Sequence, residues 1–386
     1  MIPVSRPSIG AQELAAVREV FDTGWLGLGA TTAAFEGALS QRFAGRQVVA
    51  VNTGSSALHV ALAASGIGPG DEVMVPSLTF AASVQAIVAT GATPVFCESH
   101  EETLLMDIDD TISRLTPNTK AIMPVHYCGQ ACDMDRLLAL AGERGLLIVE
   151  DAAHAFGSTC RGRPIGSFGH LTCFSFDPIK TITCGEGGAV VVEDGRVADR
   201  MRRMRLLGID RDAWQRSKGA KSWSYEVTDP GFRYHMPNFC AAIGLTQLDR
   251  LEEIVAKRRG ICRRYDEAFH RLRVVRLLKV DYAAAAPQLY IVKVPGDARD
   301  GFMAFLQARG VGTGVHYLAN HRQPFFAPFA RGPLPRAEQV AEQIVSLPLF
   351  TDMTDEEVCA VICAVTAWDQ QAADSPAAWH QMGRVA

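Results

Sequence analysis

The first two-thirds of the chain alternate between short apolar runs and longer segments in which apolar residues recur every three or four positions. The short runs predict strands, at residues 48–51, 72–75, 94–97, 120–125, 146–149, 171–176 and 187–192. The longer segments predict helices, at residues 12–22, 55–65, 81–89 and 134–144. Because such alternation is typical of βαβ units, we expect an α/β fold with a largely parallel sheet between helices.

The pattern changes after residue 244, where residues 247–271 form a long, charged segment with helical spacing. A strand is predicted next, at residues 289–294, followed by helices at residues 301–309, 340–346 and 356–368. We therefore expect a large domain over residues 1–244 and a smaller α+β domain over residues 245–368. Residues 369–386 show no sustained period and are expected to form a weakly ordered tail.

Residues 73–97 carry no charged side chain and have the length of a membrane span. Pro76, Gln85, Gly91 and Pro94 divide this stretch, so strand–helix–strand is the better interpretation. The N-terminus lacks an apolar segment of signal-peptide length. We therefore expect a cytoplasmic protein with no membrane partner.

Charge and cysteine spacing argue against several other classes of protein. Lys plus Arg number 38 against 42 Asp plus Glu, a net charge of −4, which argues against a nucleic-acid partner. The ten cysteines include no CxxC pair, because Cys128/Cys132 and Cys359/Cys363 are CxxxC. We expect reduced, mostly buried thiols of a cytosolic enzyme. The ten histidines form no tight metal pattern, so we expect no metal site.

Candidate chemistry gathers around Lys180, which lies in the irregular connection between the strands predicted at 171–176 and 187–192. Connections at strand ends are where α/β enzymes place their chemistry. Pyridoxal phosphate needs a lysine amine for its Schiff base and an acid that keeps its pyridine nitrogen protonated. Asp151, at the end of an apolar run, can supply that acid, or it could cap a helix that follows.

The same cofactor needs a binding site for its phosphate and a side chain that packs on its pyridine ring. Gly54 and Ser55 lie in a small polar turn between a predicted strand and helix, where free amides can hold a phosphate, although such residues also cap ordinary helices. Ser175 is a further phosphate ligand or a strand residue at a polar edge. Phe80 could stack on a pyridine ring or be a core side chain.

These segments together resemble the nucleotide-sugar aminotransferases of the DegT/DnrJ/EryC1/StrS family, which are fold-type I pyridoxal-phosphate enzymes. The resemblance covers residues 7–368, nearly the whole chain. The motifs that carry it are Ser77-Leu78-Thr79-Phe80, Pro124-Val125-His126-Tyr127, Glu150-Asp151-Ala152-Ala153-His154, Ser175-Phe176 with Lys180 and Gly185-Glu186-Gly187-Gly188, Ala241-Ala242-Ile243-Gly244 with Gln247-Leu248, and Gly312-Thr313-Gly314-Val315-His316-Tyr317.

The resemblance implies roles for the candidate residues. It implies that Lys180 binds the cofactor and shuttles the proton, and that Asp151 pairs with the pyridine nitrogen. It also implies that His154 is a catalytic residue in contact with the cofactor. The other cofactor contacts that it implies are Phe80 on the ring and Gly54, Ser55 and Ser175 on the phosphate. The family's dehydratase branch has histidine in place of the lysine, so Lys180 favours transamination.

Two departures from the family pattern matter for the site. Many members have glutamine where this chain has His154. The pattern Gly-Tyr-Asn-Tyr-Arg-Met appears as Gly231-Phe232-Arg233-Tyr234-His235-Met236. The asparagine that usually reaches the partner subunit's cofactor phosphate is thus Arg233, which is either a cofactor or substrate ligand or a solvated charge. His154, the cation at position 233 and the segment 212–214 are similar to the branch that forms 4-amino-4-deoxy-L-arabinose on UDP.

By this resemblance we expect a homodimer with composite active sites. It would transfer the amino group of L-glutamate to a nucleotide-linked keto sugar, and we expect the keto group at C4. Trp25, His316 and His321 are candidates to line the sugar site. The alternatives are an aminotransferase for 3-keto sugars or keto-cyclitols, and a regulatory protein that keeps the cofactor fold without turnover. The intact pair of Lys180 and Asp151 disfavours the regulatory protein.

Overall fold

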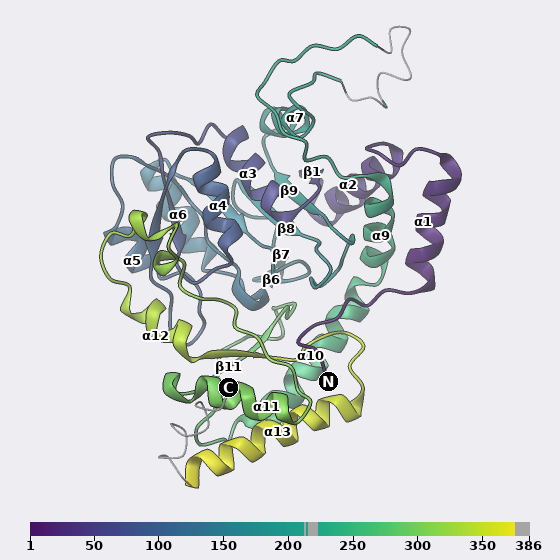
Figure 1. Ribbon diagram of the computed structural model, residues 1–386. Helices are drawn as coiled ribbons and strands as arrows, with labels where there is room; N and C mark the ends of the chain where they lie inside the picture. The colour runs from purple at the N-terminus through teal and green to yellow at the C-terminus, as the bar shows by residue number, and fades with distance from the viewer. Residues whose placement is uncertain (212–213, 215–222, 375–386) are drawn as a thin grey trace.

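The computed structural model describes residues 1–211, 214 and 223–374 (Figure 1). Its centre is a seven-stranded sheet with the order β1–β9–β8–β5–β4–β2–β3. The strands are β1 Gln47–Val51, β2 Glu72–Pro76, β3 Thr93–Cys97, β4 Thr119–Ile122, β5 Leu147–Asp151, β8 Leu171–Ser175 and β9 Gly188–Val192. Strand β9 runs antiparallel to both its neighbours, whereas the other ladders are parallel. The predicted, largely parallel sheet is confirmed.

Helices cover both faces of this sheet (Figure 1). One face packs on α2 Ala30–Arg42, α6 Met134–Arg144 and α9 Asn238–Asp249, and the other on α3 Gly54–Ala64, α4 Ala81–Ala89 and α7 Gly195–Met204. Strand β1 shows the arrangement: Val48 and Ala50 enter one core, while Val49 and Val51 enter the other. Strands buried on both faces are apolar throughout, which explains the uninterrupted apolar runs of the sequence.

A second group of elements lies below the large sheet in Figure 1 and has its own hydrophobic core. Its antiparallel sheet consists of β10 Arg276–Leu277, β11 Tyr290–Lys293 and β12 Ile344–Leu347. Its helices are α10 Leu251–Phe269, α11 Arg299–Ala308 and α13 Asp355–Asp374. The boundary that we placed at residue 244 falls inside α9, and the first break in the chain's helical path comes at Arg250.

Shorter elements complete the described chain. They are α1 Ala11–Thr23, α5 Ile108–Ser113, α12 Pro335–Gln343, the hairpin β6 Thr159–Cys160 and β7 Arg163–Pro164, and the 3₁₀ turns Tyr127–Gly129, Gly296–Ala298, Asn320–Arg322 and Ala327–Phe329. Within the described ranges, no helix combines the length and apolar character that crossing a membrane requires. The uncharged stretch 73–97 forms β2, α4 and β3, as predicted.

Several predicted elements need correction. The segment 247–271 is two helices, because Arg250 adopts φ −99° and ψ 1°, away from helical values. The helix predicted at 340–346 is wrong in its second half, where β12 pairs with β11. All of β12 is buried, and periodicity cannot separate a buried strand from a buried helix. Helix α2 was not predicted.

The C-terminal tail also differs from the expectation. Residues 369–374, which we assigned to a weakly ordered tail, continue α13. Asp369 is 2% exposed, and its carboxylate accepts the backbone N–H groups of Arg273, Val274 and Val275 at 2.7–2.9 Å. A buried acceptor for three amides holds this end of the helix in place. Residues 375–386 lie outside the described part of the chain.

Candidate active site

A cavity of about 470 Å³ lies at the carboxyl edge of the large sheet. Apart from β9, the strands of this sheet run in one direction, so their carboxyl ends and the turns that follow them meet there. The side chains around it come from distant parts of the chain: Thr53, Gly54, Ser55, Leu58, Thr79, Phe80, Ala82, Val125, Asp151, Ala153, His154, Ser175, Asp177, Pro178, Ile179, Lys180, Glu186, His316 and Tyr317.

Lys180 lines this cavity from the turn after β8, and its side chain is 10% exposed. Its Nζ lies 3.7 Å from Oδ2 of Asp177. Burial lowers the pKa of Lys180 below its usual value, and the charges of Asp177 and Asp151 oppose that shift. A buried amine of lowered pKa can act as a nucleophile and a base closer to neutral pH than a surface lysine.

Asp151 is the last residue of β5 and is 5% exposed. Its Oδ2 accepts the hydroxyl hydrogen of Ser83 at 2.6 Å, and its Oδ1 accepts the N–H of Ala153 at 3.1 Å. Residues 152–158 form turns rather than a helix, so the alternative in which Asp151 caps a helix is wrong. Two donors fix the carboxylate at the cavity wall.

The polar turn before α3 meets the end of β8 in the same cavity. Thr53 caps the helix, because its Oγ1 accepts the N–H of Ser56 at 3.0 Å. The first amides of a helix have no partner within the helix and carry its positive dipole end. A Cβ on Gly54 would come within 2.6 Å of the Cβ of Ser175, so the turn needs glycine here. Gly54, Ser55 and Ser175 are thus brought together as the sequence suggested.

Aromatic side chains form one side of the cavity. Phe80 is 58% exposed, which rules out the core alternative, and its ring lies 5.4 Å from that of Tyr317. Tyr317 Oη lies 3.0 Å from His154 Nε2. Among the described residues, Nδ1 of His154 has no hydrogen-bond partner. Burial, together with the charge of Lys180, lowers the pKa of His154 well below its usual value, so the ring is a neutral group with one unused nitrogen.

The three residues predicted to line the sugar site lie in three different places, and only His316 lies in the cavity of Lys180. His316 lines the cavity, and burial beside the charge of Lys180 lowers its pKa to about 4. His321 lies behind the wall, 6% exposed, with its ring nitrogens on Ser77 Oγ at 2.7 Å and Glu338 Oε1 at 3.0 Å. Because both nitrogens are engaged, His321 has a structural position rather than the expected place in the sugar site.

Trp25 and Arg233 lie together, but not in the cavity of Lys180. They line a separate surface cavity of about 380 Å³ with His235 and the apolar Leu26 and Leu207. Within one chain, Arg233 therefore does not join Asp151 and Lys180. The exposed guanidinium leaves both of its alternatives, ligand or solvated charge, open.

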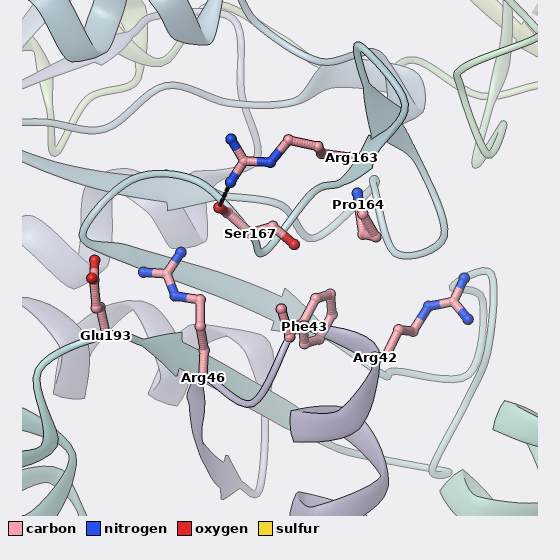
Figure 2. Close-up of a pocket in the computed structure, with 8 residues that line it drawn as sticks. Arg42, Phe43, Arg46, Arg163, Pro164, Ser167 and Glu193 are labelled. Atoms are coloured by element: carbon pink, nitrogen blue, oxygen red, sulfur yellow. Dashed lines mark hydrogen bonds between the residues drawn. The ribbon is translucent and has the colours of Figure 1, made fainter.

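A further cavity, of about 420 Å³, lies on another part of the molecule (Figure 2). It is rich in arginine, yet its guanidinium groups are already engaged. Arg42 pairs with a glutamate of α10, Arg46 donates to carbonyls of the loop 166–170, and Arg163 donates to a carbonyl of the same loop. Glu193 adds a negative charge. The cavity of Lys180 is therefore the better candidate for an active site.

Comparison with known proteins agrees with this geometry. Residues 7–366 match the DegT/DnrJ/EryC1/StrS aminotransferase family. The chain belongs to this family. It is a pyridoxal-phosphate-dependent aminotransferase, and the predicted fold-type I architecture is confirmed by solved structures of similar enzymes.

Three of these structures show the extent of the similarity. The aminotransferase TlmJ from Streptoalloteichus hindustanus is 36% identical with a TM-score of 0.90, over 97% of this chain and 100% of TlmJ. DesV from S. venezuelae, solved with a ketimine intermediate, is 36% identical with a TM-score of 0.86, over 93% and 94% of the two chains. The putative sugar aminotransferase Spr1654 from Streptococcus pneumoniae, in its PMP form, is 31% identical with a TM-score of 0.90, over 96% and 100%.

Neighbours of this kind associate the aminotransferase with amino-sugar biosynthesis, with a sugar substrate and an amino-group donor. Pyridoxal phosphate is the usual cofactor of the family. The similarity to the arabinose-forming branch stays a prediction. Of the segment 212–214 that contributed to it, residues 212–213 lie outside the described residues.

Three side chains of the aminotransferase site were not singled out from the sequence: Ser83 on Asp151, Tyr317 on His154, and Asp177 beside Lys180. Asp177 lies three residues before Lys180, a spacing that the sequence displays. Ser83 and Tyr317 reach their partners across 68 and 163 residues of chain. No local pattern reports such contacts, because the fold alone brings these segments together.

Proposed function

We propose that this aminotransferase transfers the amino group of L-glutamate to a keto sugar carried on a nucleoside diphosphate, at C4 of the sugar. The observation that carries the proposal is the meeting of Lys180, Asp151 and the turn before α3 in one cavity. The turn suits a phosphate, Asp151 suits a protonated ring nitrogen, and Lys180 suits a carbonyl carbon.

The residues present fit pyridoxal phosphate. The cradle at Gly54 would be closed by a Cβ, so a phosphate can approach the helix amides closely. The unused Nδ1 of His154 is a buried polar atom that a ligand group can satisfy. The neighbouring aromatic side of the cavity, formed by Phe80 and Tyr317, suits a planar ring. Residues with roles toward the cofactor are therefore Gly54, Ser55, Ser175, Phe80, His154, Asp151 and Lys180.

When bound, the cofactor supplies an electron sink for the bonds that break next to the transferred nitrogen. Asp151 would hold a proton on the ring nitrogen, since its carboxylate is fixed by Ser83 and Ala153. Lys180 Nζ would carry a proton from the amino carbon of glutamate to C4′ of the cofactor in the first half of the transfer, and from C4′ to the former keto carbon of the sugar in the second half. Burial lowers the pKa of Lys180, so its amine loses a proton closer to neutral pH than a surface lysine does.

We further propose that two copies of the chain complete each site. Trp25 and Arg233 share a surface cavity with exposed apolar residues, which is a composition that a partner copy can cover. In a homodimer, Arg233 of one copy would reach a phosphate in the site of the other, because a guanidinium forms strong charge-assisted bonds to phosphate oxygens.

The test is an assay of purified protein with L-glutamate and a panel of nucleotide-linked sugars that differ in nucleotide and keto position. Product mass identifies the sugar that gains an amine, and Lys180→Ala is the matched control. Borohydride reduction followed by peptide mapping should place the pyridoxyl group on Lys180. Conversion of 3-keto sugars or keto-cyclitols alone would replace the 4-keto assignment. A bound cofactor whose visible absorption does not change with glutamate would indicate a protein without turnover.

A further inference from the structure

The turn that carries Lys180 is built on one carboxylate. Asp177 Oδ1 accepts the N–H of Ile179 at 2.9 Å, and the Asp177 carbonyl accepts the N–H of Lys180 at 3.2 Å. Pro178 lies between them, with a fixed φ. The backbone of the lysine is thus anchored on Asp177 from two sides, while Oδ2 of the same carboxylate is left to face Lys180 Nζ at 3.7 Å.

The other carboxylate beside the lysine is engaged differently. Asp151 uses one oxygen on Ser83 and the other on Ala153. Among the described residues, Asp177 is the ion-pair partner of Lys180, and it is 31% exposed while the lysine is 10% exposed. A buried ammonium next to a half-exposed carboxylate is stabilised by that charge while its other surroundings disfavour it.

Four other titratable side chains line the same cavity: His154, His316, Tyr317 and Glu186. Burial, together with the charge of Lys180, lowers the pKa values of His154 and His316, so both rings are neutral. Burial raises the pKa of Tyr317. Burial and then the charge of Asp177 raise the pKa of Glu186, the other carboxyl group at this end of the cavity. Asp177 and Asp151 are the charges that act on the lysine.

We infer that Asp177 is a positioning residue for Lys180, which anchors the lysine's turn with one carboxylate oxygen and retains the lysine proton with the other. The inference rests on the proposed function for its purpose: a lysine that moves a proton from one carbon to another must hold that proton, in place, between its removal and its delivery. It goes beyond that function because it assigns the control of Lys180 to a residue outside the pair with Asp151.

The test uses two substitutions to separate the roles of the two carboxylate oxygens of Asp177. Asp177→Asn keeps an oxygen that can accept the N–H of Ile179 and removes the charge, whereas Asp177→Ala removes both. The full-length chain without cofactor is trace-labelled with acetic anhydride over a range of pH, and peptide mapping gives the titration of Lys180. Glu186→Gln is the matched control, since it removes another carboxylate from the same cavity. Amide hydrogen exchange of residues 177–180 reports the turn.

We expect Asp177→Asn to lower the pKa of Lys180, and so to speed its acetylation at neutral pH by about threefold to tenfold, because an opposite charge at this distance shifts a pKa by one unit or more and partial exposure reduces that effect. Glu186→Gln should titrate as wild type. Asp177→Ala should add faster amide exchange, which Asp177→Asn should not.

An unchanged Lys180 titration in Asp177→Asn would overturn the charge role, and equal exchange in wild type and Asp177→Ala would overturn the anchoring role. Both readouts are made without substrate or turnover. A protein that aminates no sugar but shows the expected titrations would therefore disprove the proposed function alone. An active aminotransferase with unchanged titrations would disprove this inference alone.

Discussion

At the scale of single residues, the site depends on how one carboxylate is held. Asp151 faces the cavity with both oxygens engaged, by the hydroxyl of Ser83 and the N–H of Ala153. A hydrogen bond to a charged group contributes about 1.5–3 kcal/mol, so the loss of either donor would leave the carboxylate less firmly held. We therefore expect Ser83 to act on the reaction through Asp151.

We predict that Ser83→Ala lowers kcat by about tenfold to a hundredfold, which corresponds to the loss of one such hydrogen bond, and that Asp151→Asn lowers it much further. The amide of Asn cannot keep a ring nitrogen protonated. Steady-state kinetics and circular dichroism would show loss of rate with retained fold. Ser65→Ala, which removes a hydroxyl that donates to the Ala61 carbonyl, serves as the control and should keep the wild-type rate. A near-normal rate for Asp151→Asn with full cofactor content would exclude Asp151 from the chemistry.

At the scale of elements, two helix ends carry the clearest consequences. The N-terminus of α3 approaches β8 so closely that only glycine fits at residue 54. The C-terminal half of α13 is fixed by the buried Asp369, which accepts three backbone amides of the segment before β10. The N-terminus of α3 forms the candidate phosphate site, and the C-terminal half of α13 packs in the second hydrophobic core.

We predict that Gly54→Ala weakens cofactor retention and destabilises the protein by about 1–3 kcal/mol, because the added Cβ must displace Ser175. The control is Gly37→Ala in α2, where a Cβ meets nothing within 4 Å. That change should be neutral or stabilising by up to about 1 kcal/mol. Urea unfolding and the visible absorption of bound cofactor after dialysis measure the two effects. Equal behaviour of the two variants would contradict the close approach of α3 to β8.

We predict that Asp369→Ala costs about 3 kcal/mol of unfolding free energy, since it leaves three backbone donors without their charged acceptor. Asp374→Ala removes a carboxylate from the same helix, but one that is 74% exposed in its pair with Arg273. Its effect should stay within about 0.5 kcal/mol. If both variants unfold alike in urea, Asp369 is not the attachment point of α13.

The sequence was informative wherever one element decided the outcome. Alternating apolar runs located the strands of the large sheet. The position of Lys180 between two of them indicated a strand end, where the structure has a cavity that Lys180 lines. Prediction was wrong where a distant partner decides, as at β12, whose apolar run becomes a strand because β11 pairs with it. For the same reason, Ser83 and Tyr317 were missed, and His321 was placed in the sugar site although Ser77 and Glu338 hold it behind the wall.

At the scale of the whole molecule, Trp25 and Arg233 lie apart from Lys180 within one chain. A single copy therefore leaves the predicted contact of Arg233 with the cofactor phosphate unmade. The homodimer that we propose would bring each Arg233 to the site of the other copy. Because each site would then take residues from both copies, a different mutation in each copy would leave one of the two sites intact.

We predict that Arg233→Ala weakens binding of the cofactor or the nucleotide sugar, and that mixing it with Lys180→Ala restores part of the activity. We expect each variant alone to have little activity, whereas one site of the mixed dimer would have both residues. Activity is measured after subunit exchange, and differently tagged chains confirm that mixed dimers form. If mixed dimers form and stay inactive while each variant remains folded, Arg233 does not act across the dimer. A fully active Arg233→Ala would make the residue a solvated surface charge.

The order of strands in the large sheet also affects the chain while it is being made. Strand β1 forms its ladder with β9, in a register that pairs Gln47 with Val192. At about 5–20 residues per second, ribosomes take on the order of ten seconds to synthesise the chain between these two residues. During that time an apolar strand has emerged without its partner, and an unpaired edge is a template for aggregation. The position of β9 between β1 and β8 thus sets how long a growing chain must be protected.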